Sequence, residues 1–199
     1  MPTGVHLRDV RKQLFDAAGR VLLRDGPNGL TSRAVTTEAD VAKGVLHRHF
    51  ADFDDFLADL VRDRITRLAD QAALLHAAAG TRTVVANIVD ALTEFFDPVT
   101  VALASLIFFR DELRARLRRT AGGLPLLVEA GEMLTTYLSA EREQGRIAAD
   151  AEAESLSLSL IGAAHLLFAG RRRNTRPAPE ELTKLAGTVL ADVLQRRLL

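Results

Sequence analysis

Apolar residues recur at helical spacing from near the start of the chain. Leu, Val and Ala side chains return every three or four residues, as they do along one face of an amphipathic helix; they are Leu7, Val10, Leu14, Ala17, Ala18, Val21 and Leu22. Gly26 is suited to the left-handed conformation that often ends a helix, and Pro27 cannot continue one. The pattern predicts a first helix that ends at Gly26.

Two short helices and a long one are predicted next. Thr31 is suited to cap a helix through about residue 38, because its hydroxyl can accept a hydrogen bond from a free backbone N–H. A turn follows at about 39–41, and a third short helix covers about 42–49. Asp52 is expected to cap a fourth helix that extends to Gly80, with two more acidic residues in its first turn, where the helix dipole favours negative charge.

Further helices are predicted at about 82–96, 98–119, 125–144, 151–170 and 179–198, separated by Gly and Pro. No segment alternates apolar and polar residues with the period of two that strands require. The pattern predicts an all-α protein of about nine helices, divided into a three-helix N-terminal domain over residues 1–53 and a larger helical domain over 54–199.

Charge is unevenly distributed although the net charge of the 199-residue chain is zero. Residues 1–50 contain eight Lys and Arg against five Asp and Glu, so the basic excess belongs to the N-terminal quarter. The chain has no cysteine, which removes disulfides and thiolate ligands from consideration. No secretion signal is recognisable at the start, and the longest uncharged stretch, 155–170, is shorter than the roughly 20 residues that span a bilayer. We expect a cytoplasmic protein with no membrane partner.

The second and third predicted helices, joined by a short turn after a longer helix, form a helix-turn-helix. Its inward-facing residues are expected to be Ala34, Val35, Val41, Leu46 and Phe50. In such a motif the last helix enters the major groove of DNA. The residues left to face a duplex are Ser32, Arg33, Lys43, Gly44, Val45, His47, Arg48 and His49.

Residues 11–57 resemble the TetR family of transcriptional regulators. The matching features are the Ala-Ala pair and following Gly in the first helix, Leu-Thr before the second, Val-Ala-Lys-Gly entering the third, and His-Phe closing it. The chain departs from the family at Asp40, where a Gly is usual in the turn, at His47, where a Tyr is usual, and at Phe53, where a Lys is usual. A non-Gly residue with positive φ costs on the order of 1 kcal/mol. Phe53 is expected instead to join an apolar brace with Phe50, Phe56 and Leu57.

The resemblance implies a homodimer that binds double-stranded DNA at a palindromic operator and is released by a small, largely apolar effector. Residues 1–53 would then be the DNA-binding domain, and 54–199 the effector-binding and dimerisation domain. The protein would be a ligand-responsive transcriptional repressor. The three departures leave one alternative open, a helical ligand- or protein-binding dimer whose helix-turn-helix no longer recognises a specific DNA sequence.

An effector site is expected among the middle helices, with an apolar lining and a few polar groups. The candidate lining residues are His76, Ile88, Leu92, Phe95, Phe96, Leu106, Phe109, Met133, Tyr137 and His165. Most of these residues are equally consistent with an ordinary hydrophobic core.

A dimer interface is expected from the last two helices, because 151–170 is apolar almost all the way round and needs cover on more than one side. The candidate interface residues are Leu156, Leu160, Ile161, Leu167, Phe168, Leu182, Leu185, Val189 and Val193. The alternative is that both helices bury these side chains only against their own chain.

Catalysis and cofactor binding are not indicated. No nucleotide-binding, nucleophile-elbow or zinc-protease motif occurs. The run His47-Arg48-His49 is a poor metal site, since neighbouring helix positions do not share a face. The basic run at 171–176 is explained by the carbonyl-rich end of the helix before it, which attracts cations. We therefore expect no enzyme activity, cofactor or metal.

Overall fold

Helix boundaries in the N-terminal segment follow their local signals. The computed structural model describes residues 3–117, 124–171 and 175–196, and its first helix, α1, covers Thr3–Asp25. Gly26 follows with a φ of 74° and donates its N–H to the carbonyl of Leu22 at 2.9 Å. The hydroxyl of Thr31 accepts the N–H of Ala34 at 3.1 Å and so caps the next α-helix. Both predicted boundaries are confirmed.

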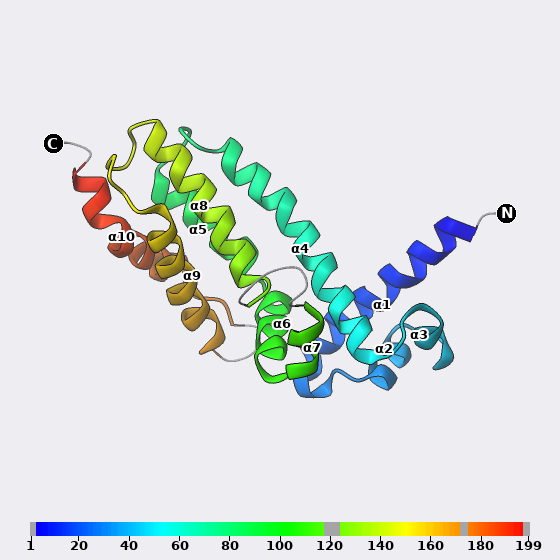
Figure 1. Cartoon of the computed structure of the whole chain (residues 1–199). Helices are drawn as coiled ribbons and strands as arrows, with labels where there is room; N and C mark the ends of the chain where they lie inside the picture. Colours follow the sequence, from blue (N-terminus) through cyan, green and yellow to red (C-terminus); the bar gives the residue numbers. More distant parts are fainter. Residues whose placement is uncertain (1–2, 118–123, 172–174, 197–199) are drawn as a thin grey trace. The chain divides into compact units, whose positions relative to one another are not determined.

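The described residues form ten α-helices and one short 3-10 helix, and they contain no strand (Figure 1). The all-α prediction is therefore confirmed. After α1 the elements are η1 (Pro27–Gly29), α2 (Ser32–Glu38), α3 (Gly44–His49), α4 (Phe53–Ala77), α5 (Val84–Phe95), α6 (Pro98–Phe109), α7 (Asp111–Leu117), α8 (Leu127–Glu143), α9 (Ala153–Ala169) and α10 (Pro179–Arg196).

The single helix predicted over 98–119 is wrong, because the chain breaks at Arg110 into α6 and α7. The Arg114 guanidinium donates to the carbonyl of Phe108 at the end of α6. The N–H of Arg114 donates to the carbonyl of Arg110 at 3.0 Å and opens α7, whose first turn contains two acidic residues favoured by the helix dipole. No Gly or Pro marks this break, so the sequence pattern missed it. Residues 118 and 119 lie outside the described part.

The helices belong to two compact units. The first comprises Met1–Asp63 and Ala102–Pro125, and the second comprises Arg64–Val101 and Leu126–Leu199. The core of the first unit combines apolar side chains of α1, α2, α3 and the start of α4, namely Leu14, Ala17, Ala18, Val21, Leu22, Val35, Leu46, Phe50, Phe56 and Leu57. This unit extends beyond the predicted N-terminal domain, because α4 continues unbroken past residue 53 and α7 contributes to the same unit.

In the second unit α8 packs against α9, and α10 packs against both α5 and α9. Its core includes Ile88, Leu92, Leu134, Leu138, Leu160 and Leu190. Among the described residues, no single helix is long and apolar enough to cross a membrane. Helices α5 and α6 are long and apolar enough only when taken together, and the chain bends by 68° between them.

The turn between α2 and α3 depends on the unusual backbone of Asp40, which has a φ of 53°. The N–H of Asp40 donates to the carbonyl of Thr37 at 3.2 Å, and the N–H of Val41 donates to that of Thr36 at 3.0 Å. This pair of bonds is the Schellman motif, in which the residue after the helix cap takes the left-handed conformation. The positive φ expected at this Gly-like position is therefore confirmed.

A buried polar network joins α5, α8 and the α4–α5 turn. Glu141 is completely buried on α8 and accepts the hydroxyl of Tyr137 at 2.5 Å and the N–H of Gly80 at 3.3 Å. The guanidinium of Arg146 lies 3.0 Å from the same carboxylate. Asn87 of α5 donates to the Tyr137 oxygen at 3.0 Å. Burial, and then the bond to Glu141, raise the pKa of Tyr137 far above its ordinary value. The phenol therefore remains a neutral donor.

We expect Asp40→Gly to stabilise the protein by about 0.5–1 kcal/mol, because glycine adopts a positive φ without the steric cost paid by other residues. The gain is measured from urea unfolding. Asp70→Gly is the matched control: Asp70 is exposed within α4, where glycine should destabilise by about 0.5–1 kcal/mol. A loss of stability in the Asp40 variant would contradict a strained turn.

Tyr137→Phe should destabilise the protein by about 1–3 kcal/mol, because it removes one hydrogen bond from a buried carboxylate that water cannot reach. The same unfolding measurement applies. Thr136→Val on the neighbouring position is the control, since that hydroxyl is exposed and bonds only to the Glu132 carbonyl of its own helix at 2.9 Å. Its effect should stay below about 0.5 kcal/mol. Equal losses in the two variants would show that the network contributes nothing specific.

Candidate nucleic-acid interface and pockets

The outward face of the helix-turn-helix is set by the residues that α3 buries. Leu46 of α3 and Phe50, which follows it, lie in the core of the first unit together with Val35 of α2. Ala34 and Val41 are half-buried. These are the residues expected to face inward, so α3 turns its other side chains toward solvent.

The outward face of this motif is cationic. Lys43, Gly44, His47 and Arg48 are exposed, and so is Arg33 on α2. Within the described residues no ion pair engages Arg33, Lys43 or Arg48, whereas Arg20 and Arg24 of α1 are both paired with Glu38. The remaining predicted contacts, Ser32, Val45 and His49, are half-buried. The three unpaired cations are accessible to an anionic partner.

Aromatic rings hold the start of α4 against the helix-turn-helix. Phe56 lies edge-on to Phe50 with ring centroids 5.1 Å apart, and Phe53 stacks on Phe56 at 5.6 Å. Phe15 of α1 approaches the Phe56 ring at 5.7 Å. The predicted brace of Phe50, Phe53, Phe56 and Leu57 is therefore supported by the ring contacts and by the burial of Leu57.

Ion pairs fix the first turn of α4 within the first unit. Asp52 accepts the N–H of Asp55 at 2.8 Å, as expected of a helix cap, and pairs with Arg116 of α7 at 2.6 Å. The bond from Asp55 and then the Arg116 guanidinium hold the pKa of Asp52 below its ordinary value. Asp54 pairs with Arg110 at 3.1 Å. Arg110, in the loop before α7, and Arg116 of α7 thus anchor the helix that follows α3.

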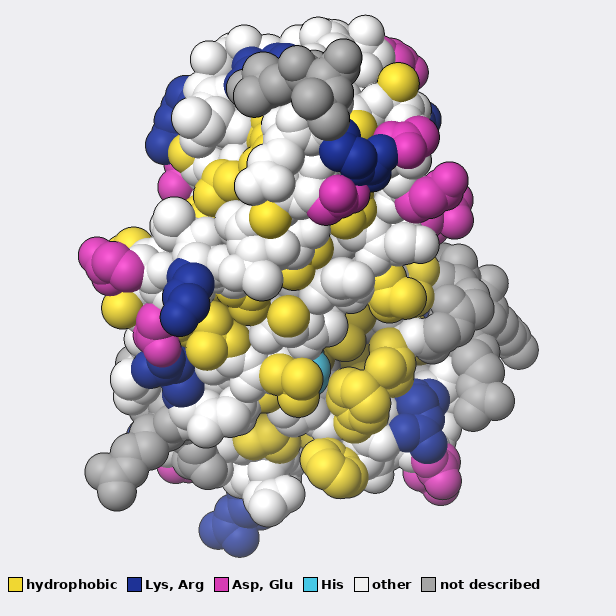
Figure 2. Space-filling model, turned by 90° about the vertical axis from the view of Figure 1, so that its left-hand side faces the viewer, with side chains coloured by type: hydrophobic (Ala, Val, Ile, Leu, Met, Phe, Trp, Pro, Cys, Tyr) yellow, Lys and Arg dark blue, Asp and Glu magenta, His cyan; other side chains and the backbone are white. Residues whose placement is uncertain are grey.

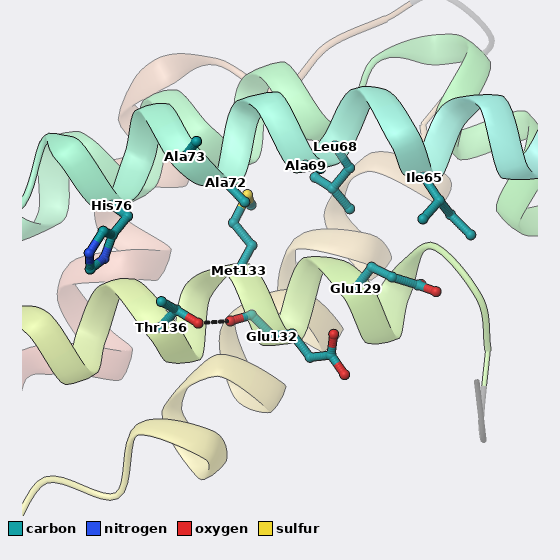
Figure 3. Close-up of a pocket in the computed structure, with 10 residues that line it drawn as sticks. All are labelled: Ile65, Leu68, Ala69, Ala72, Ala73, His76, Glu129, Glu132, Met133 and Thr136. Carbon is teal, nitrogen blue, oxygen red and sulfur yellow. Dashed lines mark hydrogen bonds between the residues drawn. The ribbon is translucent and has the colours of Figure 1, made fainter. Parts of the chain in front are cut away.

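A pocket of about 400 Å³ lies between α4 and α8 in the second unit (Figure 3). Met133 extends from α8 toward Ala72, and His76 extends from α4 toward α8. The pocket is lined by Ile65, Leu68, Ala69, Ala72, Ala73, His76, Glu129, Glu132, Met133 and Thr136.

Of the ten predicted effector-site residues, His76 and Met133 line this pocket. The sequence analysis missed its other lining residues; the signal that was available is the run of alanines on one face of α4, whose small side chains leave space opposite Met133. The two glutamates give the pocket an acidic edge, although Glu129 also accepts the N–H of Leu126 at 2.6 Å.

The other predicted effector residues lie elsewhere. Four are core residues of the second unit, namely Ile88, Leu92, Phe96 and Tyr137. Phe95 lines a cavity of about 270 Å³ beside α4. His165 is half-buried near the Phe96 ring, and burial lowers its pKa. Leu106 and Phe109 line a cavity of about 500 Å³ in the first unit. The ten residues are therefore distributed over several places in the fold.

The predicted interface residues of α9 and α10 are mostly covered within their own chain. Five are buried, namely Leu160, Ile161, Phe168, Leu182 and Val193. Four are half-buried, namely Leu156, Leu167, Leu185 and Val189. Leu158 and Leu166, which the sequence analysis did not name, are each 75% exposed on α9. Figure 2, which shows the side where α9 and α10 lie, has hydrophobic side chains gathered in a broad central area with most charged groups around it.

The described part of the chain contains no group of three or more His, Asp or Glu side chains arranged to hold a metal ion. The basic run at 171–176 is only partly described, since 172–174 lie outside that part. Arg171 pairs with Glu181 in the first turn of α10.

Comparison with known proteins finds a family match for the helix-turn-helix. The family model described as "Bacterial regulatory proteins, tetR family" matches residues 14–60. The HTH-type transcriptional regulator PksA of Bacillus subtilis (strain 168) is 34% identical over 76 residues, which are 36% of this chain and 37% of that protein. The match thus spans little more than a third of the relative's length.

Two solved structures share the fold over nearly the whole chain. A TetR-family regulator from Mesorhizobium loti MAFF303099 is 14% identical with a TM-score of 0.68, covering 96% of this chain and 97% of its own. The regulator FadR from Bacillus subtilis, solved in complex with stearoyl-CoA, is 16% identical with a TM-score of 0.66, covering 92% and 97%. Residues 14–60 thus form a helix-turn-helix that matches the TetR family of bacterial regulatory proteins, and the fold that continues from it is shared with a solved regulator of that family.

Proposed function

We propose that this protein is a DNA-binding transcriptional repressor that acts as a homodimer and is released from its operator by a small, largely apolar effector. The observation that carries the proposal is the outward face of α3, where Lys43, His47 and Arg48 are exposed while Leu46 fixes the helix in the core. A helix held in this way can enter a major groove without rearranging its own unit.

Each predicted contact residue, including the half-buried Ser32, Val45 and His49, is given a role by its chemistry. Arg33 and Lys43 contact phosphates, because a cation at the edge of the motif meets the backbone first. Arg48 or His47 approaches base edges, where an Arg bonded to guanine contributes about 1–3 kcal/mol of discrimination. Gly44 lets the helix approach closely, and Val45 contacts a thymine methyl group. Ser32 and His49 contact the flanking backbone.

A second copy of the chain is proposed to cover the exposed apolar face of α9 and α10. Leu158 and Leu166 are the most exposed apolar side chains of α9, and Leu185 and Val189 of α10 are half-buried. One helix-turn-helix contacts too few phosphates for useful affinity, so pairing is favoured. Two-fold symmetry then requires a palindrome with half-sites about 34–36 Å apart.

The pocket between α4 and α8 is the proposed effector site. FadR, whose fold this chain shares, was solved with stearoyl-CoA bound, which supports a ligand-binding role for this fold. Helix α4 is continuous from Phe53, three residues after the core residue Phe50, to the pocket residue His76. An effector is proposed to wedge α4 and α8 apart and pivot α4, so that the α3 helices of the two subunits no longer match successive major grooves. If it binds this spread form a hundredfold more tightly, it contributes about 2.7 kcal/mol toward release.

DNA binding is tested by fluorescence anisotropy with the DNA upstream of the protein's own operon. Arg48→Ala should lower the preference for the specific site over a scrambled duplex by about 1–3 kcal/mol. Lys43→Ala should weaken the binding of both duplexes alike. It should also reduce the slope of log affinity against log salt concentration by about 0.9 for each phosphate that is no longer neutralised. Lys12→Ala, a change at an exposed cation on α1, is the control.

Weak, salt-sensitive binding of every duplex by the unmodified protein would instead support the alternative, a ligand- or protein-binding dimer that does not recognise a specific sequence. The one feature at His47 that favours this alternative is the residue type, since an imidazole stands where a Tyr side chain is usual. Reversed effects of the Arg48 and Lys43 variants would show that the two roles were exchanged.

The dimer is tested by light scattering after gel filtration. Leu158→Asp combined with Leu166→Asp should give a monomer, because two charges would be buried unpaired in the interface, at a cost of several kcal/mol. Leu74→Asp is the matched control, since Leu74 is 69% exposed on α4 and outside this face. A double variant that remains dimeric would exclude the α9–α10 face as the interface.

A further inference from the structure

The first unit contains a cavity to which the proposed function assigns no ligand, although its lining includes Ser32, one of the proposed DNA contacts. It has a volume of about 500 Å³, and its lining comes from the α1–α2 connection, the start of α2, Phe53 of α4, and the end of α6. We infer that this cavity is a binding site for a small aromatic carboxylate, distinct from the effector pocket between α4 and α8.

The apolar part of the cavity fits an aromatic body. Leu30 and Leu106 are buried and form fixed wall, while Phe109 is 88% exposed at the end of α6. Covering the exposed Phe109 ring with a flat apolar ligand should favour binding, because burial of apolar surface contributes about 25 cal/mol per Å². Stacked or edge-on packing of two rings adds to this free energy. Phe53 supplies a second aromatic surface to the same cavity.

The polar part of the cavity fits an anion. Of its ten lining residues none is acidic, and Arg110 carries the only formal charge. Thr31 and Ser32 add hydroxyl groups; the Thr31 oxygen already accepts the N–H of Ala34, so its own proton is available to donate. Guanidinium and hydroxyl donors together match a carboxylate, which only accepts hydrogen bonds.

The existing partner of Arg110 sets how strongly this site attracts an anion. Asp54 lies 3.1 Å from the Arg110 guanidinium and neutralises part of its charge. A guanidinium has five N–H donors, so it can bind a second carboxylate beside the first, though more weakly than if it were unpaired. Removing the Asp54 charge should therefore strengthen the binding of an anionic ligand.

The two pockets differ in the charge of their lining residues. The α4–α8 pocket contains two glutamates in its lining and no Lys or Arg, whereas the cavity of the first unit contains an arginine and no acid. A ligand's charge thus decides which pocket it prefers. If the proposed DNA contacts hold, a carboxylate beside Thr31 and Ser32 also places negative charge near the phosphate-facing edge of α2 and weakens operator binding.

Three probes with one aromatic body and different charges test the site in the absence of DNA: 4-biphenylcarboxylate, 4-biphenylmethanol and 4-biphenylmethylammonium. Isothermal titration of the full chain should show the carboxylate binding most tightly to this site. Phe109→Ala should weaken carboxylate and alcohol alike, and Arg110→Met should weaken the carboxylate about tenfold while leaving the alcohol nearly unchanged. Asp54→Asn should tighten carboxylate binding by about threefold.

Location is read from a single fluorophore, because the chain contains no tryptophan. Phe109→Trp places one in the cavity rim, and 4-biphenylcarboxylate should shift and quench its emission. Phe108→Trp is the control, since Phe108 is 40% exposed and does not line the cavity. Ala72→Phe, which fills the α4–α8 pocket, should leave carboxylate binding unchanged.

Each contrary result overturns the assignment. Absence of carboxylate binding at millimolar concentration, equal affinity for the three probes, or binding lost in Ala72→Phe but kept in Phe109→Ala would each exclude this site. Thermal unfolding checks that the Arg110→Met variant is folded. If it is not, the Phe109→Ala variant still tests the site. None of these measurements uses DNA. The carboxylate site could therefore be confirmed in a protein that does not bind an operator, or excluded in one that does.

Discussion

Burial of Leu46 and Phe50 is the constraint on which the rest of the first unit depends. These two side chains lie in one core with Val35 and the apolar face of α1, and Phe50 meets the Phe56 ring edge-on. A helix of six residues cannot be stable alone in water, so α3 exists because this core holds it. Once Leu46 is inward, Lys43, His47 and Arg48 point outward, so the cationic outward face follows from the packing.

The turn that orients α3 is obtained at some energetic cost. Asp40 takes the left-handed conformation for which glycine is the usual residue, and two backbone bonds of a Schellman motif hold it there. Asp tolerates this conformation better than most side chains, so the turn keeps its geometry. On the other side of α3, ion pairs from Arg110 and Arg116 to the first turn of α4 limit its freedom. The short helix α3 is thus held by the Asp40 turn before it and by the anchored first turn of α4 after it.

The two pockets show how one helical chain can present different chemistry in each unit. Alanines on α4 opposite Met133 create space beside two glutamates, and Phe109 and Leu106 create space beside an arginine. In the second unit, the buried Glu141 network ties the end of α4 to α5 and α8 close to one end of the α4–α8 pocket. Breaking this network would leave a buried carboxylate without its hydrogen-bond donors.

Local signals in the sequence determined the helices and their caps. Gly26, Thr31 and Asp52 act through hydrogen bonds within a few residues of themselves, so their effect is visible without knowing what lies nearby in space. The helix-turn-helix and the residues that face its core could also be predicted, because period and polarity fix which side of a short helix is buried. Of the eight residues predicted to face outward, Ser32, Val45 and His49 are half-buried. Only the tertiary structure decided the rest. At the break at Arg110 the Arg114 guanidinium donates to the Phe108 carbonyl, and no Gly or Pro in the sequence marks the break. Periodicity marked α9 as apolar on nearly every side, yet it could not say that Leu160 and Phe168 are covered by their own chain while Leu158 and Leu166 remain in water. The pockets were hidden for the same reason: an empty space is defined by residues distant in sequence, and a large apolar side chain looks the same in a core as at a cavity wall.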